Sequence, residues 1–278
     1  MRIGVRGHDV KADSFQHLVE EINRQGFLCS QLALKKAIKE FPTHKEAMTP
    51  GLACYIKEVF ANNHVDIAVL GCYLNLANPD KQQLEDIIDT YKRHIQFASI
   101  LGCGLVGTET GACNVEYKYE PANHSEEALD IFIKNLSTVV EYAEKLGVII
   151  GIEPVYKHIM NDAKRTRKVL DAIGSPNLQV IFDPVNLLYE GNYHNHKEIV
   201  EEFLQLNGKD IAVIHAKDFV IENDKLKPVA CGMGLFEYDS LLSYIKKNKP
   251  YIHVLLENTT PENAETAREF MEQKYSSL

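Results

Sequence analysis

Long hydrophobic runs are missing from this sequence. No stretch approaches the roughly 18 apolar residues of a membrane span. The N-terminal segment MRIGVRGHDV also lacks the apolar stretch of about 7–15 residues that is typical of a signal peptide. We therefore expect a cytoplasmic protein that has no membrane partner.

Cysteine is sparse, and its spacing forms no recognisable pair. The six cysteines lie along the chain without a CxxC motif, at Cys29, Cys54, Cys72, Cys103, Cys113 and Cys231. In a chain of 278 residues this spacing does not indicate a disulfide framework. We expect reduced thiols in an intracellular protein.

Positive charge is in deficit. The chain has 30 Lys and Arg against 39 Asp and Glu, a net charge of −9. Nucleic-acid binding depends largely on basic side chains that neutralise phosphates, so this balance argues against a nucleic-acid partner. A small molecule held through a metal ion would be unaffected by it.

Linker sequences are absent too. The chain has no Pro/Gly/Ser-rich stretch, charge block or low-complexity segment that would separate two domains. Its hydrophobic fraction of 45% and charged fraction of 25% are those of an ordinary globular protein. Because α/β barrels often reach about 250 residues in one unit, we expect residues 1–278 to form a single domain.

What the sequence does contain is a regular alternation of strand-like and helix-like segments. Strand patterns occur at 2–6, 27–30, 66–71, 103–107, 148–153, 178–183, 211–215 and 253–257. Helical spacing occurs at 14–24, 45–62, 81–101, 125–146, 163–173, 196–206, 238–247 and 261–274. Ser125 is a predicted N-cap, and Gly147 a predicted helix end. Eight such units predict a closed (β/α)8 TIM barrel; an open doubly wound sheet is the alternative, but no GxGxxG follows the first strand.

Each of the last four strand segments ends in a residue that can bind a metal ion. VIIGIE ends at Glu153, LQVIFD at Asp183, IAVIH at His215 and HVLLE at Glu257. They follow one another at intervals of roughly 30 to 40 residues, the length of one strand–helix unit, so the strands should run parallel. Parallel strands place all four ends at the same face of the sheet, where a buried charge needs a partner.

Three carboxylates and one imidazole supply hard oxygen donors and one nitrogen donor. This set suits one divalent metal ion, Mn²⁺, Mg²⁺, Co²⁺ or Zn²⁺, which would also relieve the repulsion among the acids. If Glu153 and Glu257 lie on opposite faces of a substrate, one can remove a proton next to a carbonyl group and the other can return it.

Other polar residues near the predicted strand ends are weaker candidates. Glu109 and His158 could contact a substrate at the mouth, and His8 is a similar but weaker case. His194 and His196 lie in a loop rich in Gly and Asn without a partner acid, so we expect them to be exposed. Gly232 and Gly234 are interpreted as allowing a tight approach of the loop backbone.

These motifs resemble those of the xylose isomerase-like TIM-barrel superfamily of sugar isomerases and epimerases. The resemblance spans nearly the whole chain and is carried by GIEP, FDPVN, IHAKD, CGMGLFEYDSLL and LLENT. It implies a metal held by Glu153, Asp183, His215 and Glu257. It also implies that Glu153 and Glu257 are the acid/base pair that moves a proton at C2 or C3 of a ketose or a related polyol.

Two positions depart from the ketose 3-epimerases that the chain resembles. Those enzymes carry a His three residues after the Asp ligand and an Arg two residues after the His ligand, and both contact the substrate. This chain has Asn186 and Lys217 there. We expect both to contact the substrate; alternatively, Lys217 pairs with Asp218 or with a ligand acid.

Several functions fit these features. The first is a sugar or sugar-phosphate isomerase or epimerase that acts through an enediolate, and the second is a dehydratase of a keto-polyol such as an inosose. Remote alternatives are a DNA-repair enzyme like endonuclease IV, which would need further histidines for a three-zinc cluster, and a non-catalytic sugar-binding barrel. Members of the family are often oligomers, so a homo-oligomer is also possible.

Overall fold

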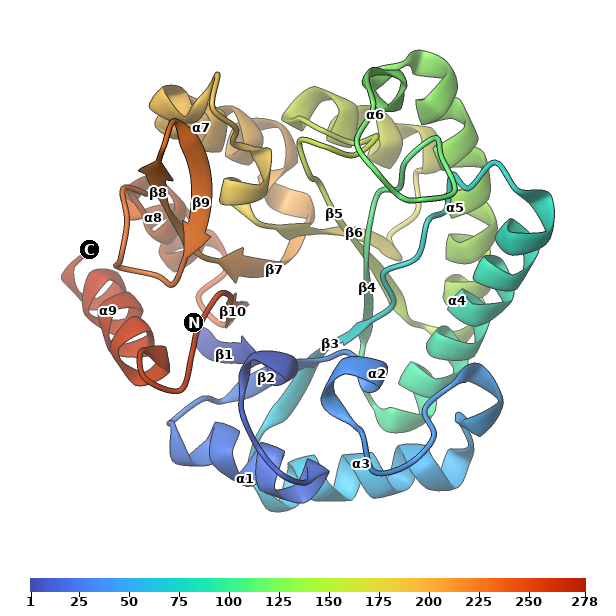
Figure 1. The fold of residues 1–278 in the computed structure, drawn as a ribbon, viewed down its shortest axis with the longest axis horizontal. Helices are drawn as coiled ribbons and strands as arrows, with labels where there is room; N and C mark the ends of the chain where they lie inside the picture. The colour runs from blue at the N-terminus through green and yellow to red at the C-terminus, as the bar shows by residue number, and fades with distance from the viewer.

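The computed structural model describes residues 1–278 and shows a closed barrel of eight parallel strands surrounded by helices (Figure 1). Around the barrel the strands follow the order β1-β10-β7-β6-β5-β4-β3-β2. Their bounds are β1 Arg2–Arg6, β2 Cys29–Leu32, β3 Asp66–Gly71, β4 Leu105–Glu109, β5 Ile149–Glu153, β6 Leu178–Phe182, β7 Ile211–Ala216 and β10 His253–Leu256. The predicted (β/α)8 barrel is confirmed.

The helices form the outer ring. They are α1 Phe15–Arg24, α2 Leu34–Ala37, α3 Pro50–Asn62, α4 Lys81–Leu101, α5 Glu126–Leu146, α6 Ala163–Ile173, α7 His196–Asn207, α8 Asp239–Asn248 and α9 Ala264–Ser277. The predicted caps of α5 are present: the Ser125 side chain accepts a hydrogen bond from Ala128 N, and Gly147 adopts the left-handed conformation. The short α2 was not predicted.

Two hydrophobic layers stabilise this arrangement. The larger one fills the space between the strands and the helix ring. The smaller one consists of strand residues inside the barrel, namely Cys29, Ala68, Val69, Leu105, Ile181, Val213 and Leu255. Because all eight strands run parallel, the polar residues at their ends gather at one face, the carboxyl-terminal one.

Two predicted strands were wrong by two residues. The segment predicted as 27–30 pairs at 29–32, because Phe27 N still donates to Ile22 O at the end of α1. The segment predicted as 103–107 pairs at 105–109, because Cys103 N closes the last turn of α4 on Ala98 O. The shift makes Glu109 the last residue of β4, where its register partner is Glu153.

A two-stranded hairpin follows β7 and was missed. It consists of β8 Asp218–Glu222 and β9 Lys225–Val229, paired antiparallel outside the barrel (Figure 1). Its two-residue turn, Asn223-Asp224, has positive φ at both positions, 52° and 58°. Asn and Asp tolerate this conformation, so the sequence ENDK carried a turn signal.

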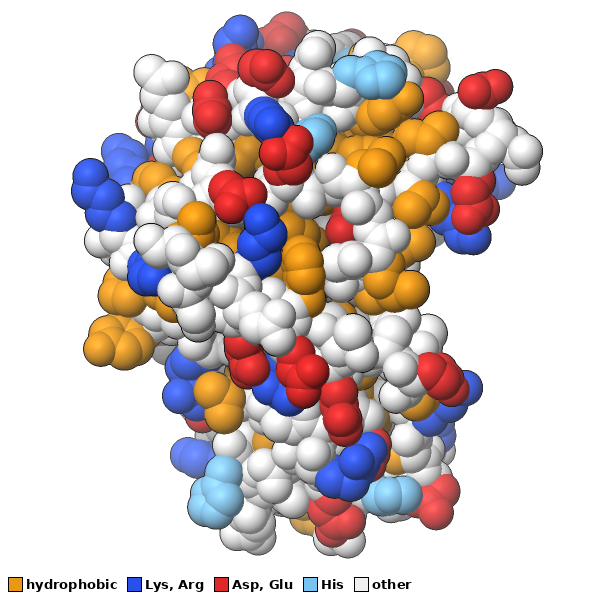
Figure 2. Space-filling view, turned by 90° about the vertical axis from the view of Figure 1, so that its left-hand side faces the viewer, with side chains coloured by type: hydrophobic (Ala, Val, Ile, Leu, Met, Phe, Trp, Pro, Cys, Tyr) orange, Lys and Arg blue, Asp and Glu red, His pale blue; other side chains and the backbone are white.

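The surface beside the hairpin and α9 is mixed in charge. Figure 2 shows this side of the molecule, where acidic and basic side chains are interspersed with apolar ones. No helix combines the length and apolar character that crossing a membrane requires.

Candidate metal centre

Four neighbouring strands deliver the four predicted ligand residues to one place. Glu153 ends β5, Asp183 follows β6, His215 lies near the end of β7 and Glu257 follows β10. These strands are consecutive neighbours in the barrel, in the order β10, β7, β6 and β5. Since all run parallel, their carboxyl ends lie side by side.

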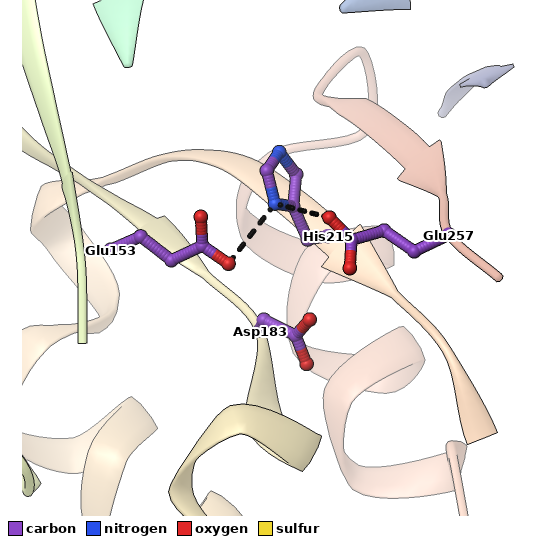
Figure 3. Close-up of side chains that lie close together, drawn as sticks. All are labelled: Glu153, Asp183, His215 and Glu257. Carbon is purple, nitrogen blue, oxygen red and sulfur yellow. Dashed lines mark hydrogen bonds and ion pairs between the residues drawn. The ribbon is translucent and has the colours of Figure 1, made fainter. Parts of the chain in front are cut away.

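The four side chains converge (Figure 3). One potential ligand atom from each lies within 4.8 Å of the others. All four residues are buried, and Asp183 and His215 are fully inaccessible. The predicted convergence is therefore present in the fold, and these residues are called the metal cluster below.

His215 lies between the two glutamates. Its Nδ1 is 3.2 Å from Glu153 Oε1 and 3.1 Å from Glu257 Oε1. Burial by itself would lower the pKa of His215, but the two carboxylates outweigh it and raise this pKa to about 10. The negative potential that holds a proton here would equally attract a metal cation.

Asp183 is positioned by the local sequence DPVN. Its Oδ1 accepts hydrogen bonds from Val185 N at 2.9 Å and Asn186 N at 3.2 Å, so it caps the turn Pro184–Leu187. Its Oδ2 is buried and makes no aligned hydrogen bond. Burial raises the pKa of Asp183 to about 6, against the opposing effect of Lys217.

The cluster fits a divalent cation. Three carboxylates face two fixed cations, Lys217 and Arg6, and His215 with its raised pKa holds a proton that balances the third carboxylate. A divalent cation would take the place of that proton. The buried Asp183 Oδ2 lies 2.7 Å from the Lys217 ammonium but makes no aligned hydrogen bond, so it can still accept a metal cation. Oxygen donors with one imidazole suit the metals named above, so these four residues could hold one.

Lys217 and Asn186 lie beside the cluster and contact each other. The Lys217 ammonium lies 2.7 Å from Asp183 Oδ2, 3.0 Å from Glu257 Oε2 and 2.7 Å from Asn186 Oδ1. Asn186 Nδ2 in turn donates to Glu153 Oε1 at 2.7 Å. Of the alternatives for Lys217, the structure shows pairing with ligand acids; Asp218 instead accepts hydrogen bonds from the backbone of its own loop.

Arg6 was not predicted as part of the site. It ends β1, and its Nη1 lies 3.2 Å from Glu257 Oε2 while its Nε donates to Asp9 Oδ2 at 2.9 Å. Glu257 is buried, which would raise its pKa, but Lys217, His215 and Arg6 together hold that pKa well below its usual range. A charged residue that closes an apolar strand was the signal used for the four ligands, and the same signal marks Arg6.

Glu109, Tyr117 and His158 form a second polar group at the mouth. The Tyr117 hydroxyl donates to Glu109 Oε2 at 3.2 Å, and the Tyr117 ring stacks on His158 at a centroid distance of 5.0 Å. His158 Nδ1 is 3.6 Å from Glu109 Oε2. Burial and the neighbouring Glu153 charge raise the pKa of Glu109 to about 7, and burial lowers that of His158 to about 4. Both predicted residues thus lie next to the metal cluster.

Tyr73 and Gln31 were also missed. Gln31, on β2, is 2% exposed, and its Nε2 donates to the Tyr73 hydroxyl at 2.6 Å. Burial raises the pKa of Tyr73 well above its usual value, as do the nearby charges of Glu153, Glu257 and Glu109. No motif marks either residue, because their contact joins two different strand–helix units.

The remaining predicted histidines lie outside the metal cluster. His8 is half-buried, and burial together with Arg6 lowers its pKa to about 4. His194 is exposed, as expected. His196 is not: it is partly buried against Phe219 and Phe236.

Two hollows lie among the loops that follow the strands, and none of the four cluster residues lines either one. One of about 190 Å³ lies beside Asn186, between the loops after β5 and β6 and the hairpin β8–β9. The other, of about 450 Å³, lies beside Tyr73, between the loops after β2 and β3.

Comparison with known proteins agrees with this geometry. A family model described as "Xylose isomerase-like TIM barrel" matches residues 19–274. A search of the curated proteins gives no match.

Several solved structures superpose along the whole chain. A D-tagatose 3-epimerase-like protein has a TM-score of 0.78 at 21% identity, covering 100% of this chain and 98% of its own. An IOLI protein with a bound zinc atom has a TM-score of 0.75 at 18% identity, covering 100% and 97%. A probable 3-DHS dehydratase, AsbF, from Bacillus anthracis has a TM-score of 0.74 at 14% identity, covering 98% of each chain. At these identities the likeness establishes the fold.

Proposed function

This chain belongs to the xylose isomerase-like TIM barrel family, and from that premise we propose that it is a divalent-metal-dependent isomerase or epimerase of a small keto sugar or sugar phosphate. The neighbours with a named activity include a D-tagatose 3-epimerase-like protein, whose name places it among sugar epimerases. The metal would be Mn²⁺, Mg²⁺, Co²⁺ or Zn²⁺, held by Glu153, Asp183, His215 and Glu257.

One observation carries this proposal: two glutamates lie on either side of a buried imidazole. Glu153 and Glu257 contact His215 Nδ1 from opposite sides, at 3.2 Å and 3.1 Å (Figure 3). Two carboxylates placed in this way can reach the two faces of one bound carbon atom. That is the arrangement that proton removal and return on opposite faces requires.

The chemistry follows from this placement. When bound, a divalent cation would polarise a carbonyl or hydroxyl group of the substrate and stabilise negative charge on it. One glutamate takes the proton next to the carbonyl, and the electrons of that C–H bond form the C=C bond of an enediolate. The other glutamate, which must enter the step protonated, gives its proton to the opposite face. The C=C electrons form the new C–H bond as the carbonyl re-forms, which inverts the carbon.

A keto-polyol dehydratase is the second candidate, and Glu109 favours it. Its pKa of about 7 means that a fraction of this carboxyl group is protonated near neutral pH. An acid next to the proton-transfer pair could protonate a leaving hydroxyl group, which an epimerase does not need. One of the structural neighbours is described as a probable dehydratase.

Incubation in D₂O with Mn²⁺ and a panel of ketoses, ketose phosphates and inososes would separate the candidates. An epimerase or isomerase incorporates deuterium at carbon with no other change in composition, whereas a dehydratase yields a product that has lost water. If no compound of the panel exchanges or loses water with any of the four metals, the proposed function is wrong.

A further inference from the structure

Asn186 and Lys217 occupy the two positions at which this chain departs from the ketose 3-epimerases, and they contact each other. Lys217 Nζ donates to Asn186 Oδ1 at 2.7 Å. The other end of the amide donates to Glu153 Oε1 at 2.7 Å, and the ammonium also donates to Glu257 Oε2 at 3.0 Å. A continuous chain of hydrogen bonds therefore runs from Glu153 through Asn186 and Lys217 to Glu257.

The ammonium of Lys217 is held by protein oxygens. It donates hydrogen bonds to Asn186 Oδ1 and Glu257 Oε2, and Asp183 Oδ2 lies 2.7 Å from it as an ion pair. Lys217 is only 6% exposed, so a substrate group has little access to this cation.

The orientation of the Asn186 amide is fixed by the charges on either side of it. Its NH₂ group faces a carboxylate, and its oxygen faces an ammonium; the reverse orientation would place like partial charges in contact. The backbones of both residues are also held, since Asn186 O accepts from Tyr156 N and Lys217 O accepts from the Tyr238 hydroxyl, each at 2.8 Å.

We infer that Asn186 and Lys217 form a strut that positions Glu153 and Glu257 for proton transfer and that neither residue binds the substrate. This inference rests on the proposed function for the two glutamates. It replaces the expectation that both residues contact substrate. It also places recognition of the distal part of the substrate elsewhere at the mouth, because the Lys217 ammonium is buried and held by protein oxygens.

The kinetic test separates positioning from binding. For K217M and N186A we expect kcat to fall about 100-fold and 10-fold, with KM changed by less than about 2-fold, because misplaced carboxylates slow the chemical step. The double variant should be no slower than K217M alone, since either change breaks the same chain of contacts. K217R, which can still bridge carboxylates, should retain more activity than K217M. K134M, which removes an exposed lysine of α5 in the outer helix ring, is the matched control and should behave like wild type.

The strut would be overturned if KM rose about 10-fold or more with little change in kcat, or if the two effects multiplied in the double variant. A second readout does not depend on activity: the thermal midpoints of the metal-free variants. If the strut exists, the thermal midpoint of the double variant should fall by less than the sum of the falls in the two single variants. Additive falls would refute the strut. Should wild type act on no sugar, the proposed function fails, while the midpoints still decide whether the two residues are coupled.

Discussion

At the scale of single residues, Asp183 shows how one side chain can serve both the fold and the site. One carboxylate oxygen caps the turn that follows β6, and the other faces the metal cluster. Because the cap uses only Oδ1, a substitution that changes only Oδ2 separates the capping role from the role in the metal cluster. Asn is as good a capping residue as Asp, so it preserves the first role.

We therefore predict that D183N folds but binds a divalent metal at least about 100-fold more weakly, because an amide NH₂ replaces a carboxylate oxygen. Calorimetric titration of the metal-free protein with Mn²⁺ measures this. D162N is the matched control: Asp162 caps α6 by accepting from Arg165 N and lies outside the metal cluster. Equal Mn²⁺ affinity in D183N and wild type would show that Asp183 is not a ligand.

Glu109 gives a prediction of pH dependence for the metal-free protein. Its pKa is about 7 in the fold against an ordinary value of 4.5, so the folded state favours the protonated acid. The stability that Glu109 contributes is thus greatest below about pH 4.5 and falls as the pH rises toward about 7. The unfolding free energy of E109Q minus that of wild type should increase by on the order of 1 kcal/mol from pH 5 to pH 8. Urea unfolding of both proteins in the presence of EDTA measures this free-energy difference. A difference that does not vary with pH would contradict the raised pKa of Glu109.

At the scale of elements, hydrophobic periodicity was enough to predict the barrel strands and most helices. The strand starts and the hairpin that depend on tertiary contacts were missed. The segments 2–6 and 66–71 match β1 and β3 because each is a short apolar run bounded by charged or glycine residues. The starts of β2 and β4 were displaced, since the helix ends before them continue into the apolar residues Phe27 and Cys103. The hairpin β8–β9 was missed because its exposed face carries charged side chains and only its turn residues mark it.

The loop after the hairpin tests the interpretation of Gly232 and Gly234. Gly232 has φ of +81°, and a Cβ on Gly234 would overlap Phe219 O and Asp218 Oδ1. Asp218 holds this loop by accepting from the backbone N–H groups of Phe219, Gly232 and Phe236. A methyl group at position 234 would therefore push directly on the side chain that organises the loop.

We predict that G234A destabilises the protein by about 1–3 kcal/mol, because the clash is with backbone and with a buried carboxylate. G104A is the control, since a Cβ there meets no atom within 4 Å. Its unfolding free energy should stay within about 0.5 kcal/mol of wild type. Equal effects of the two substitutions in chemical unfolding would mean that the loop does not need glycine at 234.

At the scale of the whole molecule, the barrel separates an apolar end from a charged one. The hollow at the amino-terminal end of the strands, about 560 Å³, is lined mainly by apolar residues such as Leu105, Ile149 and Val213. The acids, Lys217, Arg6 and His215 gather at the opposite end. The convergence of Glu153, Asp183, His215 and Glu257 could be predicted from the sequence because parallel strands bring their ends together. The contacts of Asn186, Lys217, Gln31 and Tyr73 could not, because each joins side chains from different strand–helix units.

The central claim is that one divalent ion binds where these four strands end. Diffraction data collected at the manganese absorption edge from crystals grown with Mn²⁺ test it most directly. We predict one strong anomalous peak per chain, about 2.0–2.3 Å from oxygen atoms of Glu153, Asp183 and Glu257 and from a nitrogen of His215. A peak held by other residues, or no peak at saturating Mn²⁺, would contradict the account.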